Sequence, residues 1–173
     1  MTKNSFGFPK LGVLVLSTLL VAGCSAQDPA PTTSALQDDF QAEIETTIAL
    51  TVGSQDFSLE ALQQRGTTEI EILEPFKKEK TTFTVIDLDQ LLIDSGFTAE
   101  DRVETIALND YRYADTVQAF LDNESLLAIY ENGEPIPVSE GGPVRIIFAE
   151  SSPYYSVLDA WNWSLSKIEL AGD

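Results

Sequence analysis

The residue types that most often carry out chemistry in proteins are nearly absent from this chain. It contains no histidine, and its only cysteine is Cys24. These two facts exclude a Ser-His-Asp triad, a Cys-His pair and the imidazole or thiolate sites typical of zinc and copper. They also exclude an internal disulfide bond. The chain has 28 acidic residues, so a pair of carboxylates for hydrolysis stays open, although abundance alone does not indicate such a pair.

One arginine among tyrosines is a candidate for ligand contact. Arg112 lies between Tyr111 and Tyr113, where its planar guanidinium could bind an anion. The alternative is an exposed side chain that pairs with Asp110 or Asp115. Both interpretations stay open.

Aromatic side chains near the C-terminus form a second group of candidates. Tyr154, Tyr155, Trp161 and Trp163 could line a recognition surface, because aromatic anchors are favoured in interfaces. Alternatively, Trp161 and Trp163 fill the core or cover one face of a sheet. In an extended segment the two indoles would share a face.

Two further groups of charged residues have structural explanations. Arg145 lies in an apolar run, so if buried it needs a carboxylate or carbonyl partner. Asp87, Asp89 and Asp94 could suggest calcium, but their spacing lacks the glycine and final glutamate of an EF-hand loop, and Asp87 fits a helix N-cap. We therefore expect no metal site.

The elements that must position these residues are many short strands and a few short helices. The formal net charge of −18 favours solubility and argues against nucleic-acid binding, leaving a basic partner or a weakly bound divalent cation open. The pattern predicts an α+β domain with a mixed, mostly antiparallel sheet. We expect strands over 44–52, 67–73, 82–86, 103–108, 111–113, 126–130, 144–148 and 165–170, and helices over 59–64, 87–95 and 117–121.

The segment from Leu126 to Phe148 has the clearest turn signals. Asn132-Gly133 predicts a type I′ turn. Pro135 and Pro137 each lack a backbone donor, which argues against a central strand there. Gly141-Gly142-Pro143 predicts a second sharp turn before a buried strand.

Residues 1–23 are typical of a signal peptide, with a basic start and an apolar run over 11–22 that is short for a membrane span. The run ends in Leu-Val-Ala-Gly-Cys, which resembles the lipobox of bacterial lipoproteins. That resemblance implies cleavage before Cys24, attachment of acyl chains such as palmitate to its thiol, and anchorage to a membrane. Residues 24–39, with Pro29 and Pro31, predict a flexible tether, and residues 40–173 the folded domain. The protein would then be extracytoplasmic, at the cell surface or on the periplasmic side.

The order of motifs resembles the sulfite-oxidase-type molybdopterin-binding domain family. The resemblance rests on the stretches DLDQLLIDSGF, LNDYRYADTV, LLAIYENGEPIPVSEGGPVRIIF and AWNWSLSKIEL, and covers about residues 52–170. It implies the mixed α/β core of that family. It also implies a molybdenum-binding cysteine near Glu69 to Glu74 and cationic residues for the pterin pyrophosphate. This chain has no cysteine in that segment and few cations, so no catalytic residue carries over.

Two functions are consistent with these observations. The first is a lipid-anchored, non-catalytic module that binds a partner protein or small ligand through a cleft or aromatic loop and needs no cofactor. The second is an enzyme or redox subunit that holds molybdopterin without cysteine ligation. The candidate ligand residues are Arg112, Tyr111, Tyr113, Tyr154, Tyr155 and Trp161.

Overall fold

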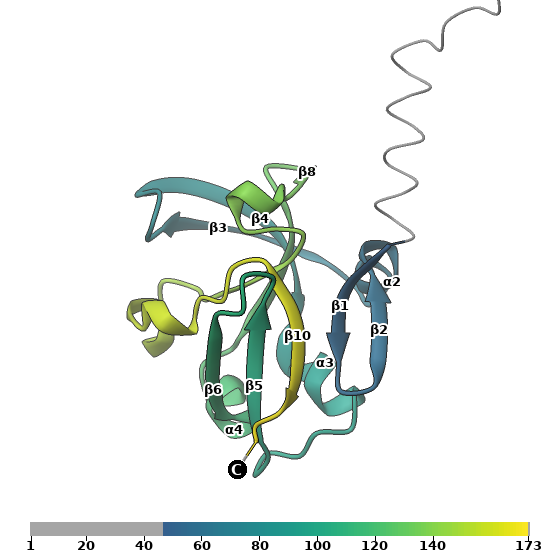
Figure 1. Cartoon of the computed structure of the whole chain (residues 1–173). Helices are drawn as coiled ribbons and strands as arrows, with labels where there is room; N and C mark the ends of the chain where they lie inside the picture. The colour runs from purple at the N-terminus through teal and green to yellow at the C-terminus, as the bar shows by residue number, and fades with distance from the viewer. Residues whose placement is uncertain (1–46, 173) are drawn as a thin grey trace, which may run out of the picture. The chain divides into compact units, whose positions relative to one another are not determined.

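The computed structural model describes residues 47–172, which contain two five-stranded sheets and three short α-helices (Figure 1). Outside the described residues lie the predicted signal peptide, Cys24, the predicted tether and the first residues of the expected strand from Ile44. An α+β fold with mostly antiparallel pairing is confirmed.

The first sheet has the strand order β2-β1-β10-β5-β6. Its strands are β1 (Ile48–Val52), β2 (Gln55–Ser58), β5 (Arg102–Ala107), β6 (Arg112–Thr116) and β10 (Leu165–Leu170). Strand β10 pairs in parallel with β1 and antiparallel with β5. The last strand of the described chain therefore occupies the centre of this sheet and joins the β1–β2 hairpin to the β5–β6 hairpin.

The second sheet is antiparallel throughout, with the order β3-β4-β7-β8 and with β9 paired to β7. Its strands are β3 (Thr68–Glu74), β4 (Glu79–Asp87), β7 (Leu126–Glu131), β8 (Glu134–Pro135) and β9 (Arg145–Ile147). The strands expected over 67–73 and 82–86 are present as β3 and β4, which pair as a hairpin that is longer than those ranges. Strand β9 is the predicted buried strand around Arg145.

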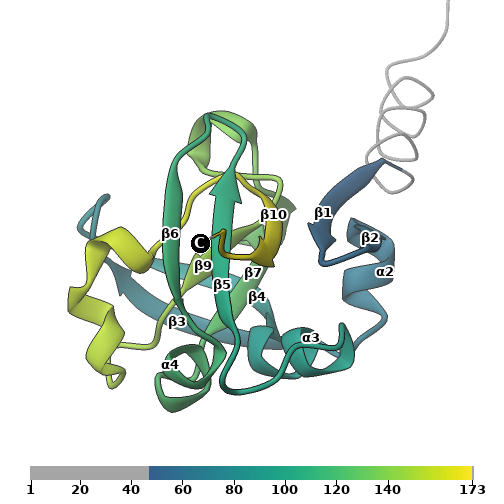
Figure 2. The same ribbon diagram turned by 60° about the horizontal axis from the view of Figure 1, so that its bottom comes forward.

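One hydrophobic core lies between the sheets and the helices. Figure 2 shows β5, β6 and β10 lying over β4, β7 and β9. Apolar side chains of both sheets are fully buried in this core, together with those of α2 (Leu59–Gln63), α3 (Leu88–Asp94) and α4 (Val117–Asp122). The helices pack against the sheets through leucine, valine and phenylalanine at helical spacing, as an amphipathic pattern requires.

Each helix begins at a polar cap. Ser58, Asp87 and Thr116 accept hydrogen bonds from the backbone amides three residues later, at 3.0 to 3.1 Å. These bonds satisfy amides that have no partner inside a first turn. The capping role predicted for Asp87 is confirmed.

The turns predicted around Asn132 and Gly142 are present. Asn132 and Gly133 have φ angles of 51° and 82°, as a type I′ turn requires. Pro135 lies in the two-residue strand β8, opposite Tyr130, at the margin of the sheet. Gly142 packs so closely that a Cβ atom there would lie 1.7 Å from the carbonyl oxygen of Ile136.

Two strands differ from the sequence prediction. Strand β2 was not expected, because Gln55-Asp56-Phe57-Ser58 has no run of apolar or β-branched residues; pairing with β1 makes it extended. Strand β6 continues to Thr116, beyond the expected 111–113, since Ala114 and Asp115 pair with β5. Within residues 47–172, no helix is long and apolar enough to cross a membrane.

The carboxyl group of Asp89, at the start of α3, makes stability depend on pH. Burial raises the pKa of Asp89 to about 7, and the charge of Asp87 adds to the rise. One of its oxygens is buried without a hydrogen-bond partner. Because the folded chain then holds a proton that the unfolded chain releases, stability falls as pH rises from about 4 to about 7.

We expect Asp89→Asn to be more stable than the wild type by about 1 kcal/mol at pH 8, a value reduced for the partial exposure of the group. At about pH 4.5 the variant and the wild type should differ little, since Asp89 is then mostly protonated in the folded chain. Urea unfolding at both pH values measures this, with Glu100→Gln, an exposed acid, as the control. An equal gain at both pH values would contradict the assignment.

Candidate functional site

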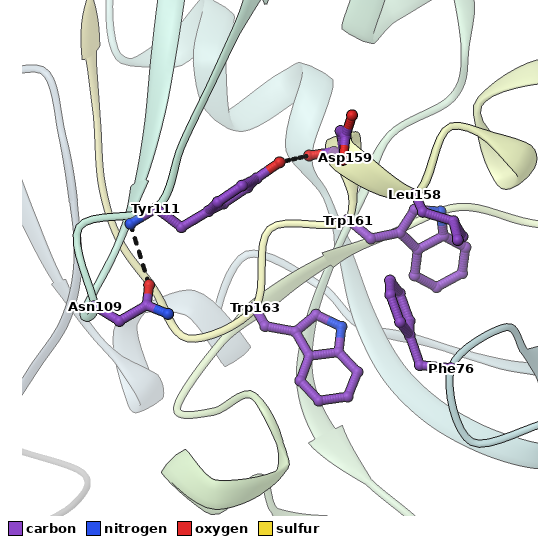
Figure 3. A pocket seen from close by; sticks show the side chains of 7 residues that line it. All are labelled: Phe76, Asn109, Tyr111, Leu158, Asp159, Trp161 and Trp163. Carbon is purple, nitrogen blue, oxygen red and sulfur yellow. Dashed lines mark hydrogen bonds between the residues drawn. The ribbon is translucent and has the colours of Figure 1, made fainter.

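Four aromatic rings surround a hollow at one end of the fold (Figure 3). We call this hollow, of about 310 Å³, the aromatic pocket. Its walls come from three places: the β3–β4 turn, the β5–β6 turn and the segment that leads into β10. The lining residues are Phe76, Asn109, Tyr111, Leu158, Asp159, Trp161 and Trp163.

Asn162 fixes the two tryptophans in place. Its side chain is fully buried, and its amide nitrogen donates to the carbonyl and hydroxyl oxygens of Thr105 in β5, at 2.9 and 3.0 Å. Its backbone carbonyl accepts from the amide of Ile146 in β9 at 3.0 Å. Asn162 therefore ties the Trp161-Asn162-Trp163 segment to both sheets, which sets both indoles at the pocket.

Trp161 belongs to the core as well as to the pocket. It is 3% exposed, and its ring centroid lies 5.8 Å from that of Phe148 and 5.7 Å from that of Tyr155. Its indole nitrogen donates to the carbonyl of Tyr154 at 3.3 Å. The core interpretation of Trp161 is thus confirmed, and one edge of the buried ring still contributes to the pocket wall.

Glu74 positions Phe76. The fully buried Glu74 carboxylate accepts hydrogen bonds from the backbone amides of Phe76 and Lys77, at 2.8 and 2.5 Å. It thereby fixes the β3–β4 turn, and the Phe76 ring stands edge-on to both indoles, with centroids 5.1 Å from Trp163 and 6.2 Å from Trp161. Phe76 remains 44% exposed.

Arg145 connects Glu74 to the second tryptophan. Its guanidinium donates to the other Glu74 oxygen at 2.7 Å, and both side chains are fully buried. The guanidinium carbon lies 4.0 Å from the centroid of Trp163, a cation–π contact. The carboxylate partner predicted for Arg145 is therefore present. The ion pair supports two walls of the pocket, Phe76 through Glu74 and Trp163 through Arg145.

Tyr111 forms the opposite wall. Its hydroxyl donates to the carbonyl of Asp159 at 3.0 Å, and its backbone amide donates to the side-chain oxygen of Asn109 at 3.1 Å. The amide nitrogen of Asn109 is thus directed towards Trp163, while the carboxylate of Asp159 points away from the hollow (Figure 3). Burial raises the pKa of Tyr111, and the negative charge of Asp159 raises it further.

Tyr113 and Tyr154 lie outside the aromatic pocket. Both hydroxyls donate to one oxygen of Asp115, at 3.0 and 2.7 Å, which joins β6 to the 3₁₀ turn η2 (Pro153–Ser156). Burial alone would raise the pKa of Asp115, but hydrogen bonds from Tyr154, from the Thr116 amide and from Tyr113 outweigh it and lower the pKa. These tyrosines are structural supports rather than exposed ligand contacts. Tyr155 likewise packs on Trp161 and donates to the carbonyl of Leu73.

Arg112 is also outside the pocket, and both partners predicted for it were wrong. Its guanidinium donates to Glu104 at 2.5 Å, because Glu104 lies on the adjacent strand β5. Asp115, one expected partner, is occupied by the two tyrosines. Of the six residues predicted for ligand contact, the pocket contains Tyr111 and Trp161.

Sequence reasoning missed several pocket residues. Phe76 had a usable signal, because an aromatic residue inside the charged turn Glu74-Pro75-Phe76-Lys77-Lys78 has no local reason to be there. Asn109 lies between the strands expected over 103–108 and 111–113 and was not identified as a candidate. Leu158 and Asp159 gave no signal: they belong to the 3₁₀ turn η3 (Leu158–Ala160), and their place depends on tertiary packing.

Two of the three aspartates considered as calcium ligands have structural partners in the described part of the chain. Among residues 47–172, no three His, Cys, Asp or Glu side chains lie in an arrangement that could bind a metal ion. Asp87 caps α3, and Asp94 pairs with Arg65. Asp89, with its raised pKa, lies on α3 and does not line the aromatic pocket.

Comparison with known protein families matches residues 32–169 to the model of the oxidoreductase molybdopterin binding domain. The chain belongs to this family. The match spans well over half of the chain and agrees with the mixed sheets described above. No curated protein matches the chain.

The residues at the aromatic pocket do not fit the cofactor of the molybdopterin-binding family. The segment in which the resemblance placed a metal-binding cysteine is strand β3, where Ile72 fills the core and Glu74 is paired with Arg145. The pocket that follows β3 is lined by no cationic side chain that could balance a pyrophosphate. Of the eight lysines and arginines in residues 47–172, six pair with carboxylates: Arg65, Lys77, Lys80, Arg112, Arg145 and Lys167.

Proposed function

We propose that this protein is a lipid-anchored, extracytoplasmic member of the molybdopterin-binding domain family that works as a non-catalytic binding module. The observation that carries this proposal is the aromatic pocket itself. It lies at the end of β3, beside the segment in which the family would place its metal ligand, and it is built from rings instead of thiolate and cationic groups.

The way the pocket is held supports a binding role. Its walls come from segments far apart in sequence and are fixed by buried polar residues: Asn162 beneath the tryptophans, and the Glu74–Arg145 pair beneath Phe76 and Trp163. Burying these polar groups is costly, all the more because Asn162 Oδ1 and Arg145 Nε have no hydrogen-bond partner, so such supports are expected where a surface must keep one shape. Preformed walls reduce the entropy lost when a ligand binds.

The chemistry available to the chain supports the absence of catalysis. No histidine is present, and the single thiol is Cys24, which the lipobox resemblance assigns to acylation. The hydroxyls of Tyr113 and Tyr154 are bonded to Asp115, and burial is the main cause that raises the pKa of each of these tyrosines. Neither tyrosine is therefore suited to transfer protons at neutral pH.

The proposal is tested with the full-length chain, expressed in a bacterial host that makes molybdopterin. We expect the purified protein to contain molybdenum and pterin far below one equivalent, measured by elemental analysis and by pterin fluorescence after oxidation. Stoichiometric molybdenum would overturn the non-catalytic assignment and favour a redox role without cysteine ligation.

The anchor is tested separately by cell fractionation and by mass spectrometry of the mature N-terminus. We expect the wild type to begin at an acylated Cys24 and Cys24→Ser to carry no acyl chain and to keep residues 1–23, because the cleavage depends on the cysteine. Ser25→Ala, the neighbouring change, should be cleaved and acylated as the wild type is. A wild-type protein found in the membrane fraction without acyl chains on Cys24 would contradict lipid anchorage.

A further inference from the structure

We infer that the aromatic pocket binds a small organic cation with an alkylated ammonium group. This inference rests on the proposed binding role and names the class of ligand. The faces of aromatic rings are electron-rich, and alkylammonium groups bind among such faces through cation–π attraction while their methyl groups bury apolar surface. Four rings from three segments line the pocket: Phe76, Tyr111 and Trp163, together with one edge of the buried Trp161.

The charges around the pocket favour a cation over an anion. No lysine or arginine lines it, and the acid Asp159 does. Its charge already raises the pKa of the Tyr111 hydroxyl, which shows that its field reaches the pocket wall. Asp110 lies in the same turn as Asn109 and Tyr111, and the chain as a whole carries a net charge of −18. An anionic ligand would meet repulsion with no compensating partner.

Two cations beside the pocket residues are already paired with carboxylates. Arg145, against Trp163, pairs with the buried carboxylate of Glu74 at 2.7 Å. Lys77, next to Phe76 in the sequence, pairs with Glu131 at 2.6 Å and with Glu140 at 2.9 Å.

The size and apolar character of the pocket set the kind of cation. A volume of about 310 Å³ accommodates a trimethylammonium group with a short substituent. Ca²⁺ and Mg²⁺ require several carboxylate or carbonyl oxygens as ligands. The lining of the pocket does not provide that many, so it does not suit a hydrated metal ion. The carboxylate of Asp159 points away from the hollow, so it acts through its field and not as a direct ligand.

Choline and its neutral isostere 3,3-dimethyl-1-butanol provide the test, because they differ in shape very little and in charge by one unit. The full-length chain in an uncharged detergent is titrated with each at matched ionic strength. Trp161 and Trp163 are the only tryptophans of the protein, so its tryptophan fluorescence reports on the pocket. We expect choline to bind at least about tenfold more tightly than the alcohol.

Variants of Tyr111 separate the ring from its hydroxyl group. Tyr111→Leu, which keeps apolar surface but loses the ring, should weaken choline binding about three- to tenfold. Tyr111→Phe should stay within about twofold of the wild type. Phe57→Leu makes the same aromatic-to-leucine change on β2, outside the pocket, and should leave binding unchanged. Asp159→Asn should weaken choline binding slightly and leave the alcohol unaffected.

Several outcomes would overturn this inference. They are equal affinity for choline and the alcohol, no fluorescence change with either ligand, or Tyr111→Leu binding choline as the wild type does. Equal affinity would leave a pocket for neutral ligands and would keep the proposed binding role. Failure of the proposed function is seen independently, as stoichiometric molybdenum in the purified protein.

Discussion

Arg145→Met is expected to lower the free energy of unfolding by about 3 to 5 kcal/mol, because it leaves the fully buried Glu74 carboxylate without its counter-charge. The backbone amides of Phe76 and Lys77 would still bond this carboxylate, but they do not neutralise it. Since the total stability of a domain is about 5 to 15 kcal/mol, this loss is a large part of it. Urea unfolding followed by circular dichroism measures the change.

The double variant Glu74→Gln/Arg145→Met separates pairing from packing. With both charges removed, the loss in the free energy of unfolding should be clearly smaller than the sum of the losses in Glu74→Gln and Arg145→Met alone. Arg145→Lys keeps the charge but loses the planar contact with Trp163. It replaces Arg145→Met in the unfolding experiment if Arg145→Met fails to fold. The near-ultraviolet circular dichroism of the tryptophans should weaken in each variant at Arg145. A loss below about 1 kcal/mol for Arg145→Met would contradict a structural role for the pair.

Gly142→Ala is expected to cost about 3 kcal/mol or more, because the added methyl group would lie 1.7 Å from the carbonyl oxygen of Ile136. The obstacle is backbone and not the end of a flexible side chain, so the segment that carries Gly141 must shift. Gly141 packs against Trp163, with a Cβ position 3.0 Å from the indole. We therefore expect the tryptophan fluorescence of the folded variant to change as well.

Gly133→Ala provides the matched comparison for Gly142→Ala. A Cβ atom at Gly133 would meet nothing within 4 Å, but the residue has a φ angle of +82°. Its replacement should cost only about 1 kcal/mol, from backbone strain alone. Thermal unfolding of the two variants in parallel checks that Gly142→Ala loses more stability than Gly133→Ala. Equal losses would show that the contact with Ile136 relaxes easily.

Much of the fold could be predicted because its signals are local. Capping by Ser58 and Asp87, the turn at Asn132-Gly133 and the alternation in residues 67–73 each depend on neighbours in the chain. Strand β2 could not be predicted in this way, since its residues become extended only by pairing with β1. The pairing of β10 with β1 is likewise a property of the whole fold.

The candidate site was harder to predict than the fold. Tyr111 was identified as a neighbour of Arg112, and Trp161 because aromatic anchors are favoured in interfaces. Arg112 was misjudged because its partner, Glu104, is a cross-strand neighbour, whereas the expected acids were sequence neighbours. The role of Glu74 depends on Arg145, which lies 71 residues later in the chain. Short-range patterns do not carry that information.

The position of β10 between β1 and β5 has a consequence for how the protein is made. The two hairpins at either end of the first sheet can form early, but they cannot pair with each other. Until residues 165–170 arrive, a nascent polypeptide keeps the inner edges of β1 and β5 unpaired, and such edges invite aggregation.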